Sequence, residues 1–378
     1  MKKIITLSFL VLLILESSGQ SAENYLEKGN EKYESSKLED AIKYFNKAIE
    51  IKQNFSEAYL KRAKAKLALL KFDEAIKDYN IVIKLSPEGF PEAYFNKALI
   101  MSLISRNDEI ELQLYNKAIK IDPKYIEAYY WRGKTKANLE DYRGAMADYI
   151  KVIELKPSYE DIYQTLGEVK IKLKDYEGAV IDFNKAIEIN PKSALAYYRR
   201  GVLFAGNELQ HLTDYKAAIN DFTNAIELNP KYTDAFLHRA MTKGISKDYR
   251  GAIADYTKVI ELDPKSSDAF SFRGLCKFIL EDFRGAVTDY TKVIELSPNS
   301  SDAYNNRGKS KFFLEDYRGA IVDFTKEIEL NPKSAGAFYY RGLMKIQLNE
   351  KNSGCLDLSK AGELGNGEAY DLIKKYCN

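Results

Sequence analysis

The sequence predicts an all-α solenoid, because one short phrase recurs at a fixed period along the whole chain. The phrase is Lys-Ala/Val-Ile-Glu-Leu/Ile or a close variant, and its ten copies run from Lys47 to Lys360. A marker residue, usually proline, follows most copies; six of the eight gaps between markers are 34 residues, and the others are 36 and 39. A period of this size indicates one supersecondary unit stacked on copies of itself. The markers are Gln53, Pro87, Pro123, Pro157, Pro191, Pro230, Pro264, Pro298 and Pro332.

The unit that ends at Pro298 shows how each repeat is built. Residues 266–268, Ser-Ser-Asp, are typical of a helix N-terminus, where hydroxyl groups cap backbone amides and an acid suits the dipole. Gly274 lets a neighbouring helix approach the first helix closely. A turn is expected over residues 281–286, and the second helix then buries apolar residues such as Tyr290 at helical spacing. Pro298 ends that helix because its ring cannot continue it.

Aligned on the markers, the repeats share an aromatic residue at position 4, Gly or Ala at position 8, Ala at position 20, an aromatic at position 24 and proline at position 32. This pattern resembles the tetratricopeptide repeat family from about residue 22 to the end. The resemblance implies a right-handed solenoid of about ten helix-turn-helix repeats over residues 22–365. We expect residues 366–378 to form a C-terminal capping helix on the exposed last repeat.

Charged residues also recur in the repeats. Arginine occupies position 7 and aspartate position 23 in the same seven units. A stripe for a ligand is one interpretation, but a repeated ion pair between helices or repeats is favoured. The unit that contains Asp182 has Leu166 in place of the arginine. At position 11, where the family has an aromatic, this chain usually has lysine; its alkyl stem is expected to cover an aromatic while the ammonium reaches water.

Residues 1–19 are predicted to be a secretory signal peptide. Lys2 and Lys3 precede the apolar run 4–15, and small residues follow, with cleavage expected after Gly19. A membrane anchor is the less favoured alternative, because a spanning helix needs about 20 apolar residues. The mature chain is therefore expected to be exported to the periplasm, the cell surface or the medium, without a stable membrane span.

The chain has three cysteines, which are Cys276, Cys355 and Cys377. Export would permit a disulfide, and Cys355 and Cys377 both lie near the end of the stack. We expect these two to be bridged, tying the capping helix to the last repeat, although two reduced and packed cysteines are the alternative. Cys276 is expected to be a small buried hydrophobic residue.

Several function classes are disfavoured by the composition. The 57 basic and 55 acidic residues are mixed at short range, so no basic stripe is present for nucleic acid. The two histidines and the lack of a Cys-x-x-Cys motif predict neither a metal site nor a cofactor. Gly133-Lys134-Thr135 ends like a phosphate-binding loop, but Ala128 stands where that loop needs glycine. The sequence thus predicts a protein that is not an enzyme.

The resemblance implies that positions 2, 5, 9 and 12 of the first helices face an inner groove. The expected partner is a peptide or segment of another protein, and the leading hypothesis is an exported protein–protein interaction scaffold. Two alternatives stay open, a carbohydrate- or small-ligand-binding protein of the cell envelope and a structural, self-assembling spacer. The candidate groove residues are Tyr130, Lys134, Asp268, Leu275, Phe278, Asp302, Asn305, Lys309, Phe312 and Tyr339.

Overall fold

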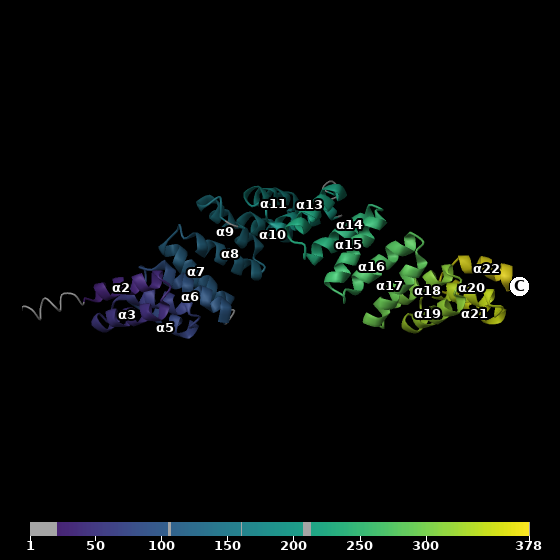
Figure 1. Ribbon diagram of the computed structural model, residues 1–378, viewed down its shortest axis with the longest axis horizontal. Helices are drawn as coiled ribbons and strands as arrows, with labels where there is room; N and C mark the ends of the chain where they lie inside the picture. Colours follow the sequence, from purple (N-terminus) through teal and green to yellow (C-terminus); the bar gives the residue numbers. More distant parts are fainter. Residues whose placement is uncertain (1–20, 105–106, 160, 207–212, 378) are drawn as a thin grey trace, which may run out of the picture. The chain divides into compact units, whose positions relative to one another are not determined.

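The computed structural model describes residues 21–104, 107–159, 161–206 and 213–377. These residues form 21 α-helices and no β-strand, in the order shown in Figure 1. Ten pairs of helices follow one another, and one further helix ends the chain, as expected of an all-α solenoid of helix-turn-helix repeats. The predicted signal peptide, residues 1–19, lies outside the described residues.

Each repeat contributes a first and a second helix. The first helices are α2 (Ala22–Glu34), α4 (Ser56–Ala68), α6 (Pro91–Ile104), α8 (Ile126–Asn138), α10 (Ile162–Lys172), α12 (Ala194–Ala205), α14 (Thr233–Ile245), α16 (Ser267–Ile279), α18 (Ser301–Phe313) and α20 (Ala335–Gln347). The second helices are α3 (Leu38–Ile51), α5 (Phe72–Leu85), α7 (Asp108–Ile121), α9 (Tyr142–Leu155), α11 (Tyr176–Ile189), α13 (Tyr215–Leu228), α15 (Tyr249–Leu262), α17 (Phe283–Leu296), α19 (Tyr317–Leu330) and α21 (Lys351–Glu363). The last helix is α22 (Glu368–Tyr376).

The described chain divides after Asp182 into two compact units, here called the N-terminal and C-terminal units. In the C-terminal unit, each first helix packs on its own second helix, and that second helix packs on the next first helix. The first helices also approach each other, since α14 contacts α12 and α16, and α18 contacts α16 and α20. Consecutive second helices contact each other less, so the first helices line the inner side of this unit. No helix in the described ranges is long and apolar enough to cross a membrane.

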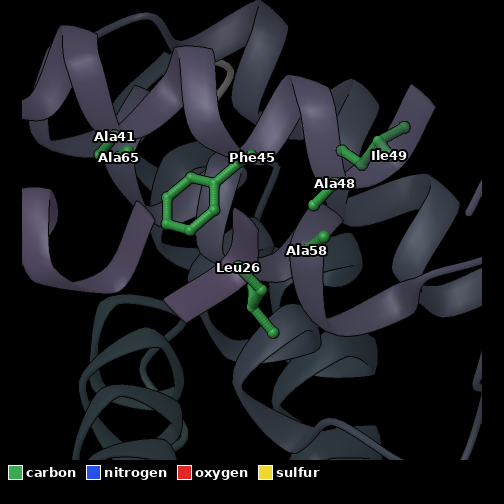
Figure 2. Packing of buried hydrophobic residues seen from close by; sticks show 7 residues of the cluster. All are labelled: Leu26, Ala41, Phe45, Ala48, Ile49, Ala58 and Ala65. Carbon is green, nitrogen blue, oxygen red and sulfur yellow. The ribbon is translucent and has the colours of Figure 1, made fainter. Parts of the chain in front are cut away.

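Buried clusters form around the aromatic residue at position 24 in most repeats, and they include residues of the next first helix. A glycine at position 8 lies against this ring in several repeats; a Cβ atom added to Gly274 would be 3.2 Å from the Tyr290 ring. Close approach of the two helices therefore requires the small residue that the sequence pattern indicated. Figure 2 shows the first of these clusters, in which Phe45 and Leu26 of the first repeat lie with Ala58 and Ala65 of α4. The fully buried rings are Phe45, Tyr79, Tyr115, Tyr149, Phe183, Phe222, Tyr290 and Phe324, and Tyr256 is 2% exposed.

The second helices begin earlier than the sequence analysis expected. Instead of a turn over residues 281–286, α17 begins at Phe283. The reason is a side-chain cap, because the Asp282 carboxylate accepts a hydrogen bond from the Gly285 backbone N–H at 2.9 Å. Such an acceptor satisfies one of the amides that the first turn leaves unpaired. The same cap occurs at Asp141, Asp248 and Asp316.

Candidate functional site

The arginine at position 7 joins three helices. The Arg307 guanidinium donates two hydrogen bonds to the Asp323 carboxylate, Nε to Oδ2 at 3.0 Å and Nη2 to Oδ1 at 2.6 Å. Its Nη1 also donates to Thr291 Oγ1 of the preceding repeat at 3.2 Å. The interpretation as a structural ion pair is therefore confirmed. We call this series the arginine–aspartate ladder; its pairs are Arg62–Asp78, Arg132–Asp148, Arg200–Asp221, Arg239–Asp255, Arg273–Asp289, Arg307–Asp323 and Arg341–Asp357.

Seven of the eight lysines at position 11 place their ammonium groups on a buried aspartate instead of in water, so that expectation is wrong for these seven. Lys311 Nζ lies 2.8 Å from Asp323 Oδ2, and its side chain is only 18% exposed. The buried aspartate has two oxygens and accepts more hydrogen bonds than the arginine alone supplies, which gives the lysine a partner inside the repeat. The charged groups of the ladder therefore take part in contacts within the protein. Equivalent pairs involve Lys66, Lys136, Lys170, Lys243, Lys277 and Lys345.

The repeat built from α10 and α11 lacks the arginine. Leu166 takes its place, and Ile150 stands in the preceding repeat where other repeats have Asn or Thr. An apolar pair has therefore replaced a polar one, which leaves Asp182 with Lys170 at 2.7 Å. Burial raises the pKa of Asp182, and the Lys170 hydrogen bond offsets part of that rise.

Two of the candidate groove residues lie together in the N-terminal unit. Tyr130 and Lys134 of α8 line a cavity of about 380 Å³, which Glu168 and Lys172 of α10 also line. The Lys134 ammonium lies 4.7 Å from the centre of the Trp131 ring, a favourable cation–π arrangement. This cavity combines an aromatic wall with charges of both signs, so it suits a polar segment with an aromatic or aliphatic portion.

The C-terminal unit has an apolar cavity of about 280 Å³ between α14, α15 and α16, which we call the Leu275 pocket. Tyr256 and Cys276 lie at its buried side, and burial raises the pKa of the Cys276 thiol. The pocket is apolar on all sides although it is open to solvent. Its more exposed lining residues, each 38–54% exposed, are Met241, Ile245, Phe272, Leu275 and Ile279.

Of these lining residues, the sequence analysis identified Leu275 alone. A signal for three of the other four was present, because Met241 and Leu275 share position 9 of consecutive repeats, and Ile245 and Ile279 share position 13. Apolar residues at the same first-helix position of neighbouring repeats come side by side on the inner surface. Comparing adjacent repeats, rather than single repeats, would have found the pocket.

Phe278 and Phe312 take part in packing instead of lining this pocket. The Phe278 ring centre is 5.5 Å from that of Phe313, and the Phe312 ring centre is 6.1 Å from that of Tyr340. These distances are typical of stabilising aromatic pairs. The two rings belong to an aromatic cluster that connects α16, α18 and α20, with Phe313 as its most exposed member at 52%.

Two polar candidates are also engaged within the C-terminal unit. Asn305 Nδ2 donates to Glu327 Oε1 at 2.8 Å, and Glu327 is a buried carboxylate on α19. The Lys309 ammonium lies 5.5 Å from the centre of the Tyr340 ring. Asn305 therefore stabilises a buried acid, while Lys309 keeps its charge at the surface of the aromatic cluster.

The remaining candidates lie at the edges of this surface. Asp268 and Asp302 are exposed in the first turns of α16 and α18, where an acid favours the helix dipole. Tyr339 packs against the cluster that α21 and α22 form, and burial raises its pKa. The structure thus groups the candidate residues into separate regions and does not bring all ten into one pocket.

The last two cysteines lie together at the C-terminal end. Cys355 of α21 and Cys377, which follows α22, are joined as a disulfide with a Cα–Cα distance of 5.8 Å. Cys276 is a free, buried thiol. In the described ranges no group of three or more His, Cys, Asp or Glu side chains is placed to hold a metal ion.

Sequence profiles place the repeats in a known family. A profile described as "TPR repeat" matches residues 29–69, 112–140 and 167–208. Profiles described as "Tetratricopeptide repeat" match residues 57–89, 200–232 and 233–266. The chain belongs to the tetratricopeptide repeat family. Such repeats generally form non-catalytic scaffolds that bind proteins or peptides.

Solved tetratricopeptide repeat structures are similar in fold. The C-terminal part of a TPR repeat-containing protein from Cytophaga hutchinsonii is 21% identical, with a TM-score of 0.56, over 65% of this chain and 98% of that chain. A tetratricopeptide repeat protein from Parabacteroides merdae is 20% identical, with a TM-score of 0.45, over 67% and 99%. YrrB, described as a TPR protein with an unusual peptide-binding site, is 25% identical, with a TM-score of 0.44, over 50% and 95%. The chain has no significant match among curated protein sequences.

Proposed function

We propose that this tetratricopeptide repeat protein is an exported scaffold that binds a peptide segment of another protein on its first helices, without catalysing a reaction. The observation that carries this proposal is the Leu275 pocket, an open apolar cavity on the inner side of the C-terminal unit. Neighbouring exposed apolar side chains of this kind often mark a protein-binding surface. The general role of the repeat family supports the same function.

The size and apolar lining of the pocket suit the apolar side chains of a peptide. Its volume of about 280 Å³ suits one or two apolar side chains. Burial of a single Leu or Phe side chain contributes roughly 1.5–3 kcal/mol. Asp268, in the first turn of α16, and Asp302, in the first turn of α18, are exposed acids that would favour basic or amide groups in the same peptide.

Selection from a displayed peptide library, followed by affinity measurement, tests this site. Leu275→Glu places a charge at the mouth of the pocket and is expected to weaken selected peptides by at least about tenfold, since burying a charge is costly. Val322→Glu is the matched control, because Val322 is 66% exposed on second helix α19 and should retain binding. Equal affinity of both variants would place the binding surface elsewhere.

Export is part of the proposal and has its own test. It is supported by the basic start and apolar run of residues 2–15 and by the paired Cys355 and Cys377, since disulfides persist in oxidising compartments. Protein recovered from the producing cells is expected to begin near residue 20 in N-terminal sequencing. An intact start on protein from the cytoplasm would contradict export.

A further inference from the structure

The arginine–aspartate ladder has a second interruption, in the repeat built from α6 and α7. Lys97 occupies the arginine position of that repeat, and Leu114 occupies the aspartate position. The Leu114 side chain is buried, and Lys97 is partly buried. No ion pair involving Lys97 occurs within the described part of the chain, and burial lowers its pKa. The repeat therefore contains a partly buried ammonium group, that of Lys97. The aspartate found at the partner position in other repeats is replaced by the apolar Leu114.

This cation lines a cavity of about 630 Å³, which we call the Lys97 pocket. Lys97 comes from α6, while α7 supplies all the other lining residues, including Lys117 and Lys120. Gln113 and Asn116 add amide groups, and Asn116 Oδ1 already accepts a hydrogen bond from Arg132, so its NH2 group is the part that can donate. The remaining lining residues are Ile110 and Leu114. None of the described residues that line the pocket is acidic.

We propose that the Lys97 pocket binds a small phosphate monoester, with its phosphate among the three lysines. A monoester carries a charge of about −1.5 to −2 at pH 7, which matches three ammonium groups better than the single charge of a carboxylate does. Ammonium groups are compact point charges that pair well with phosphate oxygens. The cavity is larger than a phosphate group, so the organic part of the ligand would lie over Ile110 and Leu114.

This site is independent of the proposed peptide function. The Lys97 pocket lies in the N-terminal unit and is formed mainly by a second helix, whereas the Leu275 pocket lies in the C-terminal unit. The Leu275→Glu variant is therefore expected to bind a phosphate monoester as the unaltered protein does. If the protein fails to bind peptides, the phosphate proposal is unaffected. If it fails to bind phosphate monoesters, the peptide proposal is unaffected.

Isothermal titration calorimetry with phenyl phosphate, at constant ionic strength, tests the proposal on the purified protein. Saturable binding is expected, with benzoate at least about tenfold weaker. Lys97→Met keeps an unbranched side chain of similar bulk and removes its charge, and it should weaken phenyl phosphate by about tenfold or more. The control is Lys84→Met, because Lys84 is exposed and occupies in the preceding repeat the position that Lys120 has here. Unchanged affinity in Lys97→Met, or benzoate binding as tightly as phenyl phosphate, would overturn the assignment.

A second variant tests the argument from the ladder itself. Leu114→Asp restores an acid at the aspartate position, where it can pair with Lys97 as Asp78 pairs with Arg62 in the preceding repeat. Loss of phenyl phosphate binding with an unchanged helical circular-dichroism signal is expected. Retained binding in a folded Leu114→Asp protein would contradict the proposal, because an internal carboxylate would then fail to compete with the ligand.

Discussion

Arg307 binds Asp323 through two hydrogen bonds in a site where the aspartate side chain is 0% exposed and the arginine 16%. Lys311 contacts the same carboxylate at 2.8 Å, so one buried acid is shared by two cations. Such an arrangement contributes little net stability compared with an apolar replacement, but removing one partner leaves charge buried without compensation. The ladder therefore contributes more to the geometry of each repeat than to its free energy of unfolding.

Asp323→Ala is expected to lower the free energy of unfolding by about 3–5 kcal/mol, because Arg307 and Lys311 lose their shared partner. Glu329→Ala is the control, since Glu329 forms an exposed ion pair with Lys326 and its side chain is 59% exposed. Exposed pairs contribute roughly 0–1 kcal/mol. Urea denaturation of both variants measures the difference. Similar losses of stability in the two variants would show that removing one partner of a buried ladder pair costs no more than removing one partner of an exposed pair.

Gly342→Ala tests the close approach of α20 and α21. A Cβ atom at Gly342 would lie 2.8 Å from the backbone oxygen of Gly354, and neither helix can move without disturbing its repeat. The expected loss is about 1–3 kcal/mol from overpacking. Gly336 lies in the same helix with nothing within 4 Å of its added Cβ, so Gly336→Ala should be neutral or stabilising by up to about 1 kcal/mol. Thermal unfolding compares them, and a milder effect at Gly342 would contradict the helix contact.

Glu111→Gln is expected to stabilise the protein at neutral pH. Burial raises the pKa of Glu111, and the hydrogen bond from Thr135 offsets part of the rise. The folded state therefore keeps this proton to a higher pH than the unfolded state does, and stability falls as pH rises through the folded-state pKa. The gain from Glu111→Gln should disappear below about pH 4, where the acid is protonated in both states. Denaturation at several pH values checks this, with exposed Glu109→Gln as the control.

The bridge between Cys355 and Cys377 predicts one free thiol, that of Cys276, in protein denatured without reductant. Three free thiols would contradict it. Closing a loop across a sequence separation of 22 residues contributes roughly 3 kcal/mol in the chain-entropy description. Reduction should therefore loosen α22 first, and hydrogen exchange would show faster exchange of the α22 amides before those of α18.

The repeat architecture was predictable because it depends on local spacing. Residues within one repeat are enough to predict the period and the small residue against each buried ring. They also predict the helix ends that a residue such as Pro298 marks. The lysines were misjudged because sequence alone did not show that Asp323 sits close enough to accept from Lys311 as well as Arg307.

The inner surface was less predictable because it depends on neighbours. Leu275 and Phe278 are both groove positions by spacing, yet Phe283 and Phe313 cover the ring of Phe278 while Leu275 lines a pocket. The contact of Asn305 likewise depends on one residue that differs between repeats. Glu327 occupies the position that Val293 has in the preceding repeat, and its carboxylate accepts a hydrogen bond from the Asn305 amide. Such contacts are set by the particular residues of adjacent helices and not by the repeat pattern.

One interruption of the ladder, at Lys97, is expected to weaken the coupling between repeats. In a repeat protein, stability is the sum of each repeat's own free energy and a nearest-neighbour coupling term. From Arg200 to Arg341, every arginine also bonds the preceding second helix, so each coupling in the C-terminal unit includes this contact. In the N-terminal unit the arginine is missing at Lys97 and Leu166. Apolar residues take its place at Leu166, whereas Lys97 is a partly buried cation without an ion pair among the described residues, so under a mechanical pull the N-terminal unit is expected to separate first at the Lys97 repeat.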